Sequence, residues 1–226
     1  MDDVLLHRVR VLVRPLVPRG LRATVNRALF GALGLALRGS RVECSCCGRT
    51  YRHFVRYPSE YCPGCGSYER QRLLCLHLER NPELVTGDVL HIAPERVIVR
   101  RFRGRAHSWL SVDIDPRFPG IERQMDLTSL SLPDASYDLV LCSHVLDVIE
   151  RHDDAVRELY RVTRPGGLAL VQAPPRGVSR DADAYAERLA SPGFRVEQIR
   201  LPEQANEPTR RRLGLDASDP IFACSR

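Results

Sequence analysis

The hydrophobic positions in the second half of this 226-residue chain form short apolar runs that alternate with stretches of helical spacing. Four runs have the length and residue types of buried strands. They are Asp88–Ile92, Trp109–Val112, Tyr137–Cys142 and Leu168–Ala173. Strands that alternate with helices predict an α/β fold with a doubly wound, mostly parallel sheet. Ligands of such sheets bind where the strands end, at their carboxyl edge.

The helices of this pattern are recognised by their end signals. Ser67 is a suitable N-cap for a linking helix, and Asn81-Pro82 ends that helix. Pro94 is well placed to open a helix directly after the first strand. Another helix begins at Asp153-Asp154, and residues 164–167 (Arg-Pro-Gly-Gly) form its exit before the last of the four strands.

Composition divides the chain into three parts: 1–41, 42–66 and 67–226. The first part holds eight arginines against two acids, the second holds five of the eight cysteines, and the third is the α/β region, which opens with the linking helix 67–81. The net charge of +6 is therefore concentrated in the first part. All 34 basic residues are arginine, which excludes chemistry that needs a lysine amine.

The basic arm, residues 1–41, interleaves arginine with leucine and valine and predicts short amphipathic helices. Its longest apolar run, Ala28–Leu37, has ten residues, about half of the ~20 that a membrane-spanning helix needs. We expect neither a spanning helix nor a cleaved secretory signal. The arm can pack on the protein's own surface, or it can make weak contact with an anionic membrane or a nucleic acid.

Two cysteine pairs dominate residues 42–66. The pairs Cys44-x-x-Cys47 and Cys62-x-x-Cys65 are separated by 14 residues, and glycine follows each pair. Four thiolates at this spacing can converge on Zn²⁺, so the segment predicts a zinc-ribbon-like element, whereas a redox pair would need only one C-x-x-C. Four cysteines close the coordination sphere, which favours a structural zinc over a catalytic one. Crowded thiols fit a reducing compartment, and we expect a cytoplasmic protein.

The remaining cysteines and the loop between the pairs leave alternatives open. Cys46 could replace a neighbouring cysteine as a ligand, while Cys75, Cys142 and Cys224 stand in apolar segments typical of core thiols. Arginines in the loop 49–56 are interleaved with aromatic rings, which could stack on nucleic-acid bases or pack within the protein.

Acidic residues end the apolar segments of the α/β region. Asp113 ends the second strand, where an acid of a Rossmann-like fold binds ribose hydroxyls. Asp126 precedes the third strand, which runs into Ser143-His144-Val-Leu-Asp147. The order of these motifs over residues 88–172 resembles the class I S-adenosylmethionine-dependent methyltransferases of the methyltransferase-11 type. A narrower resemblance, carried by 62–72, 89–95 and 213–224, is to a bacterial family of zinc-containing methyltransferase-domain proteins.

The resemblance implies S-adenosylmethionine as the cofactor and a place for each part of it. It assigns the methionine part to the loop of His91, Ala93, Pro94 and Glu95, the ribose to Asp113, the adenine to Asp126 and Leu127, and the surroundings of the sulfonium to Ser143 and His144. The chain departs from the usual pattern in three ways. Ala93-Pro94-Glu95 replaces a glycine-rich first loop, and Val148 replaces a second histidine. The segment 173–181 is also short.

The chemistry that the resemblance implies needs few protein groups. Methyl transfer from a sulfonium requires a base only for a poorly ionised hydroxyl or a protonated amine. His144 is the candidate base with Asp147 as its orienting partner, or His144 only donates a hydrogen bond in the cofactor loop. We assign Asp138 to structure, and Tyr185 and Leu189 to the core.

The predicted function is O- or N-methylation of a small molecule or a glycan intermediate. The alternative is a degenerate methyltransferase fold that acts as a zinc-containing nucleic-acid or protein binding module, which the unusual first loop would favour. A nicotinamide-dependent enzyme is disfavoured because the chain has no G-x-G-x-x-G motif and no lysine.

Overall fold

The computed structural model describes residues 18, 21–56, 60–118, 120–172, 182–200, 206–215 and 220–226. They form two compact units. We call the described residues of Met1–Leu76 and Ala205–Ala217 the cysteine unit, and those of His77–Gln204 and Ser218–Arg226 the sheet unit. The segment 173–181 and most of the arm before Leu21 lie outside the described residues. The predicted sequence boundaries at 41 and 66 stay predictions.

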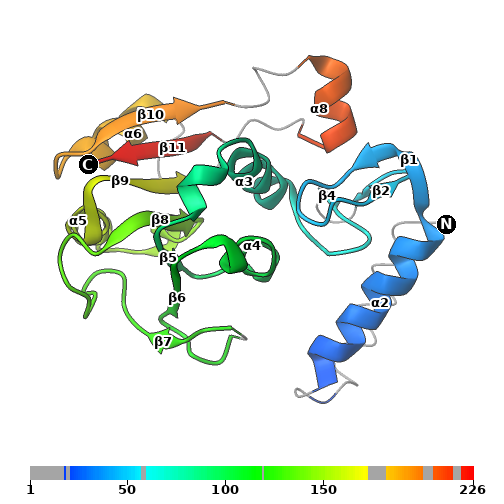
Figure 1. Ribbon diagram of the computed structural model, residues 1–226, viewed down its shortest axis with the longest axis horizontal. Helices are drawn as coiled ribbons and strands as arrows, with labels where there is room; N and C mark the ends of the chain where they lie inside the picture. The colour runs from blue at the N-terminus through cyan, green and yellow to red at the C-terminus, as the bar shows by residue number, and fades with distance from the viewer. Residues whose placement is uncertain are drawn as a thin grey trace. The chain divides into compact units, whose positions relative to one another are not determined.

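The sheet unit contains a seven-stranded sheet in the order β10-β11-β9-β8-β5-β6-β7 (Figure 1). The strands are β5 (Asp88–Ile92), β6 (Ser108–Asp113), β7 (Arg123–Gln124), β8 (Tyr137–Ser143), β9 (Thr163–Gln172), β10 (Arg195–Ile199) and β11 (Ile221–Ser225). β11 runs antiparallel to both of its neighbours, and the other neighbouring pairs are parallel. The predicted doubly wound, mostly parallel sheet is therefore confirmed.

The fourth predicted strand starts earlier than expected. Residues 164–167 belong to β9 and are not only the exit of the preceding helix, which is α5 (His152–Val162). The register of β8 against β9 shifts between Tyr137 and Leu139, so the extra residues form a bulge. Arg164 holds this bulge because its guanidinium binds the Asp138 carboxylate, which also accepts a hydrogen bond from the N–H of Asp88 at 2.8 Å. The structural role predicted for Asp138 is confirmed.

One face of the sheet is covered by α5 and α6 (Ala182–Ala190). The helical spacing of α5 directs Ala155, Val156, Leu159 and Val162 into one apolar cluster with alternate residues of β8, β9 and β11. Tyr185, Leu189, Cys142 and Cys224 belong to the same cluster, as the sequence predicted. Cys75, in the cysteine unit, is also fully buried.

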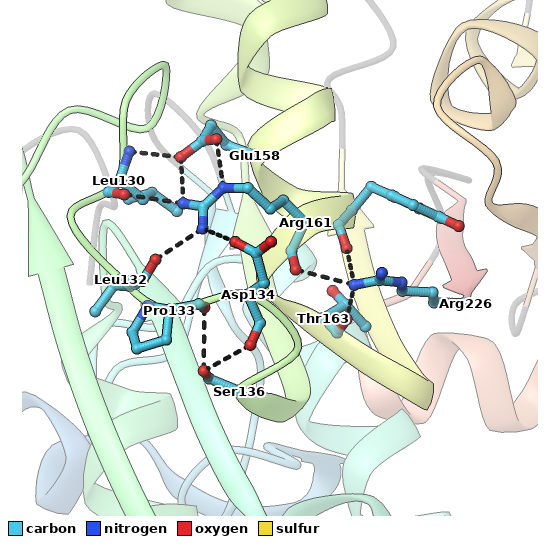
Figure 2. A network of polar contacts seen from close by, with 10 residues as sticks. Leu130, Leu132, Pro133, Asp134, Ser136, Glu158, Arg161, Thr163 and Arg226 are labelled. Atoms are coloured by element: carbon cyan, nitrogen blue, oxygen red, sulfur yellow. Dashed lines mark hydrogen bonds and ion pairs between the residues drawn. The ribbon is translucent and has the colours of Figure 1, made fainter.

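The loop between β7 and β8 is fastened to α5 by Arg161 (Figure 2). Its guanidinium donates to the carbonyl oxygens of Leu130 and Leu132 at 2.9 and 2.7 Å, and to the carboxylates of Asp134 and Glu158. The N–H of Leu130 donates to Glu158 at 2.7 Å. These bonds fix the chain that directly follows the predicted adenine residues 126–127.

The cysteine unit has short strands and only a small apolar cluster. It contains α2 (Arg22–Ala36), β1 (Arg38–Glu43), β2 (Thr50–Tyr51), β3 (Val55–Arg56), β4 (Glu60–Tyr61), the first part of α3 (Glu69–Arg80) and α8 (Glu207–Leu213). The strands form two two-stranded sheets, and the apolar cluster consists of a few residues around Leu37, Val55 and Tyr61. α2 confirms one predicted helix of the arm. None of the helices in the described ranges is long and apolar enough to cross a membrane.

The predicted N-cap at Ser67 was wrong, and one of the two interpretations of the aromatic rings in the loop 49–56 applies to two of these rings. Ser67 does not cap α3, which begins at Glu69, because its hydroxyl instead lies 3.3 Å from the Cys44 sulfur. The N–H of Tyr68 is satisfied by the Gln71 side chain at 3.0 Å. Among the rings of the loop 49–56, Tyr51 and Phe54 are buried at 1% and 3% exposure, so they pack within the protein.

Candidate functional site

The four predicted cysteine ligands come together in one cluster. The sulfur atoms of Cys44, Cys47, Cys62 and Cys65 all lie within 4.8 Å of one another. Cys44 and Cys65 are 3.7 Å apart, and Cys47 and Cys62 are 3.8 Å apart. A tetrahedral zinc with Zn–S bonds of about 2.3 Å requires sulfur atoms about 3.8 Å apart. The cluster therefore fits this ion.

The two cysteine pairs lie on two backbone turns of the same type. The N–H of Gly48 donates to the carbonyl of Cys44 at 2.8 Å, and that of Gly66 donates to Cys62 at 2.9 Å. Both glycines have positive φ, 66° and 76°, which other residues adopt only with strain. The glycine after each pair is thus required by the turn that presents the thiols.

Cys46 lies outside the cluster. It is buried, and burial with hydrogen bonds from Cys44 and Cys75 raises the pKa of its thiol well above the ordinary value. Hydrogen bonds from neighbouring thiols, led by Cys46 and Cys47, lower the pKa of Cys44 and favour its thiolate. The geometry of the described residues thus groups Cys44, and not Cys46, with the other three cysteines of the cluster.

In the sheet unit, two residues at the carboxyl ends of adjacent strands have a left-handed backbone. Ala93, after β5, has φ 46°, and His144, after β8, has φ 56°. The N–H of Ala93 donates to Val112 and that of His144 to Gln172, each at 2.8 Å. Non-glycine residues in this region are uncommon and cluster at functional sites. Ala93 thus adopts the turn for which a glycine would be the usual residue.

A pocket of about 320 Å³ opens beside Ala93. Its lining combines Ala93, Pro94 and Asp113, which the sequence had selected, with Arg96, Phe118 and Ile121, which it had not. Phe118 is 60% exposed, an unusual state for a large apolar ring. The volume lies in the range of small-molecule sites. The pocket therefore joins an apolar wall to a carboxylate at the strand ends.

Asp113 is fixed in this pocket by its own loop. Its Oδ1 accepts a hydrogen bond from the N–H of Asp115 at 2.8 Å, and its backbone carbonyl accepts one from Met125 at 2.9 Å. The second bond places Asp126 directly beside the end of β6. Asp126 is exposed, and hydrogen bonds from Thr128 lower the pKa of its carboxyl. Leu127, by contrast, is buried in the core cluster.

His91 and Glu95 form a buried pair below the first loop. His91 Nε2 lies 2.9 Å from Glu95 Oε2, and the ring of His91 is fully buried. Burial raises the pKa of Glu95, but the hydrogen bond and charge of His91 lower it more, so that it lies below the ordinary value. Ser143, also buried, donates to Gln172 Oε1 at 2.9 Å. The contact between His91 and Glu95 thus connects the end of β5 to the residue that follows Ala93-Pro94.

His144 and Asp147 are brought near each other without direct contact. Nδ1 of His144 lies 3.9 Å from Oδ2 of Asp147, which is beyond hydrogen-bond distance. Both side chains are largely buried, at 20% and 11% exposure. Val148 is 81% exposed. A charge interaction between His144 and Asp147 is available, whereas a fixed hydrogen bond requires a small movement.

Comparison with known proteins shows which proteins this chain is similar to. Residues 63–171 match the family described as methyltransferase domain, of the methyltransferase-11 type. The chain is 36% identical over 117 residues to a probable S-adenosylmethionine-dependent methyltransferase of Mycolicibacterium smegmatis, covering 44% of this chain and 46% of that protein. It is 37% identical over 116 residues to malonyl-(acyl-carrier protein) O-methyltransferase of Serratia marcescens, covering 49% and 40%. The chain spans less than half of the length of these relatives.

A solved structure supports the fold. A SAM-dependent methyltransferase from Archaeoglobus fulgidus superposes with a TM-score of 0.53 at 18% identity, covering 71% of this chain and 95% of that one. At this identity the likeness shows the architecture alone. The sequence matches assign residues 63–171 to the class I S-adenosylmethionine-dependent methyltransferases of the methyltransferase-11 type, and the N-terminal part of the chain carries a four-cysteine cluster.

Proposed function

We propose that this protein transfers a methyl group from S-adenosylmethionine to an acceptor, with the cofactor held at the carboxyl ends of β5 and β6. The observation that carries the proposal is the pocket in which Ala93, Pro94 and Asp113 meet. These three residues come from the ends of two separate strands, and all three were expected from the sequence. Such a convergence at the edge of a parallel sheet is where cofactors of this fold class bind.

The residues present fit the parts of the cofactor. The Asp113 carboxylate, oriented by the N–H of Asp115, accepts hydrogen bonds from ribose hydroxyls. Asp126 borders the adenine, Phe118 and Ile121 supply the apolar wall, and Leu127 supports them from the core. His91 and Glu95 hold the turn at Ala93, whose backbone approaches the methionine part.

The protein's contribution to the reaction is orientation and the removal of a proton. S-adenosylmethionine supplies a methyl group that its sulfonium already activates. Ser143 and His144 border the place where acceptor and sulfonium meet. His144 accepts the proton of a hydroxyl or amine, and Asp147 at 3.9 Å stabilises the resulting imidazolium. A pH profile of the rate with an ionisation lost in His144→Gln tests this role.

The acceptor that we propose is a small molecule or a glycan intermediate with a hydroxyl or amine group. Analogy supports only the methylation of an oxygen atom, because the matched Serratia marcescens enzyme is named as an O-methyltransferase. We also infer that the protein is cytoplasmic, as the crowded thiols favour a reducing compartment.

We infer further that the four cysteines hold one structural zinc. The sulfur separations of 3.7 and 3.8 Å support this ion, and four thiolates leave no position for a reacting water.

The basic arm is proposed to rest on an anionic membrane surface. α2 exposes Leu29 and Leu35 at 39% and 70%, and Leu21 before it at 56%. These exposed apolar side chains lie in the arginine-rich part of the sequence, a combination typical of segments that contact an anionic membrane. Co-sedimentation with vesicles that contain phosphatidylserine, lost in Leu35→Asp, is the expected result. Sedimentation only with nucleic acid would contradict it.

Calorimetric titration with S-adenosylmethionine and S-adenosylhomocysteine tests the main proposal. We expect a micromolar Kd, which corresponds to about 8 kcal/mol, and a loss of about tenfold or more in Asp113→Ala. Asp183→Ala, on α6, is the matched control and should bind like the wild type. No binding by zinc-loaded wild type would sink the proposal and favour the alternative, a degenerate fold that acts as a binding module.

A further inference from the structure

A second pocket, of about 440 Å³, lies wholly within the cysteine unit. It is formed where β1, the chain after β2, and α8 meet. Five arginines line it: Arg41, Arg52, Arg56, Arg211 and Arg212. Arg41 comes from β1 and the last two from α8, so the fold collects them from segments about 170 residues apart. The methyl-transfer proposal uses none of them.

The carboxylates around this arginine pocket do not balance its charge. Three pairs are present: Arg56–Glu60 at 3.1 Å, Arg212–Glu43 at 3.1 Å, and Arg211–Glu207. Arg41 and Arg52 are exposed and have no carboxylate partner within the described ranges. Glu60 is also shared with the buried Arg72. Among the described residues, six guanidinium groups therefore meet three carboxylates, and these residues give the pocket an excess of positive charge.

The wall behind these arginines is built rigidly around Arg72, which is fully buried. Its guanidinium donates to Glu60 at 2.8 Å, to the carbonyl of Gly214 at 2.7 Å and to that of Ser67 at 3.1 Å. It also stacks 4.1 Å from the centre of the Phe54 ring. Because Ser67 contacts the Cys44 sulfur, the same bonds connect the pocket wall to the cysteine cluster.

Close packing at the end of α8 shows that this wall has one arrangement. Gly214 ends the helix with φ 61°, and a Cβ at this position would lie 2.5 Å from the Phe54 ring. The N-cap of α8 is also satisfied, since Asn206 accepts a hydrogen bond from the N–H of Thr209 at 3.0 Å. The helix that carries Arg211 and Arg212 is thus fixed at both ends.

We propose that the arginine pocket binds a phosphorylated small molecule. Arginine forks match the oxygens of phosphate groups and bind them through charge-assisted hydrogen bonds. The volume suits a small ligand. A single-stranded nucleic acid would need several exposed rings on which bases stack, whereas Tyr51 and Phe54 are buried and His53 is the one exposed aromatic ring among the described residues that line the pocket. Arg41 and Arg52, which lack carboxylate partners, make the main contacts.

Titration of the full, zinc-loaded chain with inorganic pyrophosphate tests this inference. We expect saturable binding well below about 1 mM and a loss of about tenfold in the double variant Arg41→Gln, Arg52→Gln. Neither substitution breaks an ion pair of the described residues, and an unchanged zinc content and circular dichroism spectrum verify the fold. Arg195→Gln, an exposed arginine on β10, is the matched control and should retain binding.

Four results would overturn the inference. One is no pyrophosphate binding by the wild type, and another is equal binding by the double variant. The third is tight binding of a 12-nucleotide oligothymidylate where pyrophosphate fails, which would indicate a nucleic-acid surface. Saturating S-adenosylhomocysteine should leave pyrophosphate binding intact, and competition would place the anion in the cofactor pocket instead. Failure of S-adenosylhomocysteine to bind would bear only on methyl transfer.

Discussion

The sheet unit buries a continuous apolar cluster between its strands and the helices α5 and α6, whereas the largest fully buried side chain in the cysteine unit is that of Arg72. Isolated two-stranded sheets are marginally stable, and the cysteine unit has two of them over a small apolar cluster. We therefore expect the proposed zinc site and the buried guanidinium of Arg72 to make a large contribution to the stability of this unit. The two units should respond differently to metal removal, to core substitution and to acid.

The largest effect is expected from metal removal. Structural zinc sites contribute apparent binding energies of about 10–16 kcal/mol, so Cys47→Ser or a strong chelator should unfold the cysteine unit. Zinc content and near-ultraviolet circular dichroism measure the change. Cys46→Ala, outside the cluster, should keep one zinc per chain, and loss of zinc in this control would refute the assigned ligand set.

The next largest effect is expected at Arg72. Arg72→Met removes a buried cation that serves Glu60 and three backbone carbonyls, and breaking such a buried pair costs about 3–5 kcal/mol. Arg56→Met removes an exposed partner of the same Glu60 and should cost about 1 kcal/mol or less. Urea unfolding gives both values. Equal losses would show that Arg72 has no special role in this unit.

A smaller loss of stability is expected when the hydrogen bonds of Arg161 in the sheet unit are removed. Arg161→Ala frees the carbonyls of Leu130 and Leu132, yet the apolar core remains, so we expect about 2 kcal/mol. Arg157→Ala, on the same helix with one exposed ion pair, should cost less than about 0.5 kcal/mol. Thermal unfolding followed by calorimetry distinguishes them. A loss at Arg161 no larger than at Arg157 would contradict the role shown in Figure 2.

The smallest expected effect is the change that Asp88 causes in the free energy of unfolding between neutral and acidic pH. Hydrogen bonds from His107 and Ser108, and then from Arg164, lower the pKa of Asp88 to about 2. A lowered pKa means that the stabilisation is complete above the ordinary value of 3.8 and is lost as the pH falls towards 2. Asp88→Asn should therefore reduce the difference in unfolding free energy between pH 5 and pH 2.5. An unchanged difference would show that Asp88 is not involved.

The difference between the units also explains what the sequence could predict. The strands of the sheet unit were predicted because central parallel strands are buried on both faces and appear as continuous apolar runs, as in Tyr137–Ser143. β10 and β7 were not predicted, since Arg195–Ile199 alternates with polar residues and Arg123–Gln124 is exposed. β11 was not predicted either, although Ile221–Ser225 is largely apolar and buried. The cysteine spacing predicted the thiol cluster directly.

The remaining features depend on contacts between distant segments. α8 joins the cysteine unit through Arg72, whose bond to Gly214 spans 142 positions, and no local pattern announces such a contact. Phe118 and Ile121 line the pocket beside Ala93 because the loop after β6 folds back, whereas Asp113 and Ala93 could be found from their place at strand ends. The cofactor-binding and catalytic roles of all the selected residues stay proposals.

Hydrogen exchange measured by mass spectrometry, with chelator and with S-adenosylhomocysteine, tests the contrast between the two units most directly. The account predicts that a chelator accelerates exchange in β1, β2 and α8 but leaves β8 and β9 protected. It also predicts that S-adenosylhomocysteine slows exchange at Ala93–Arg96 and at the end of β6. Equal acceleration in β8, or no protection around Ala93, would contradict it.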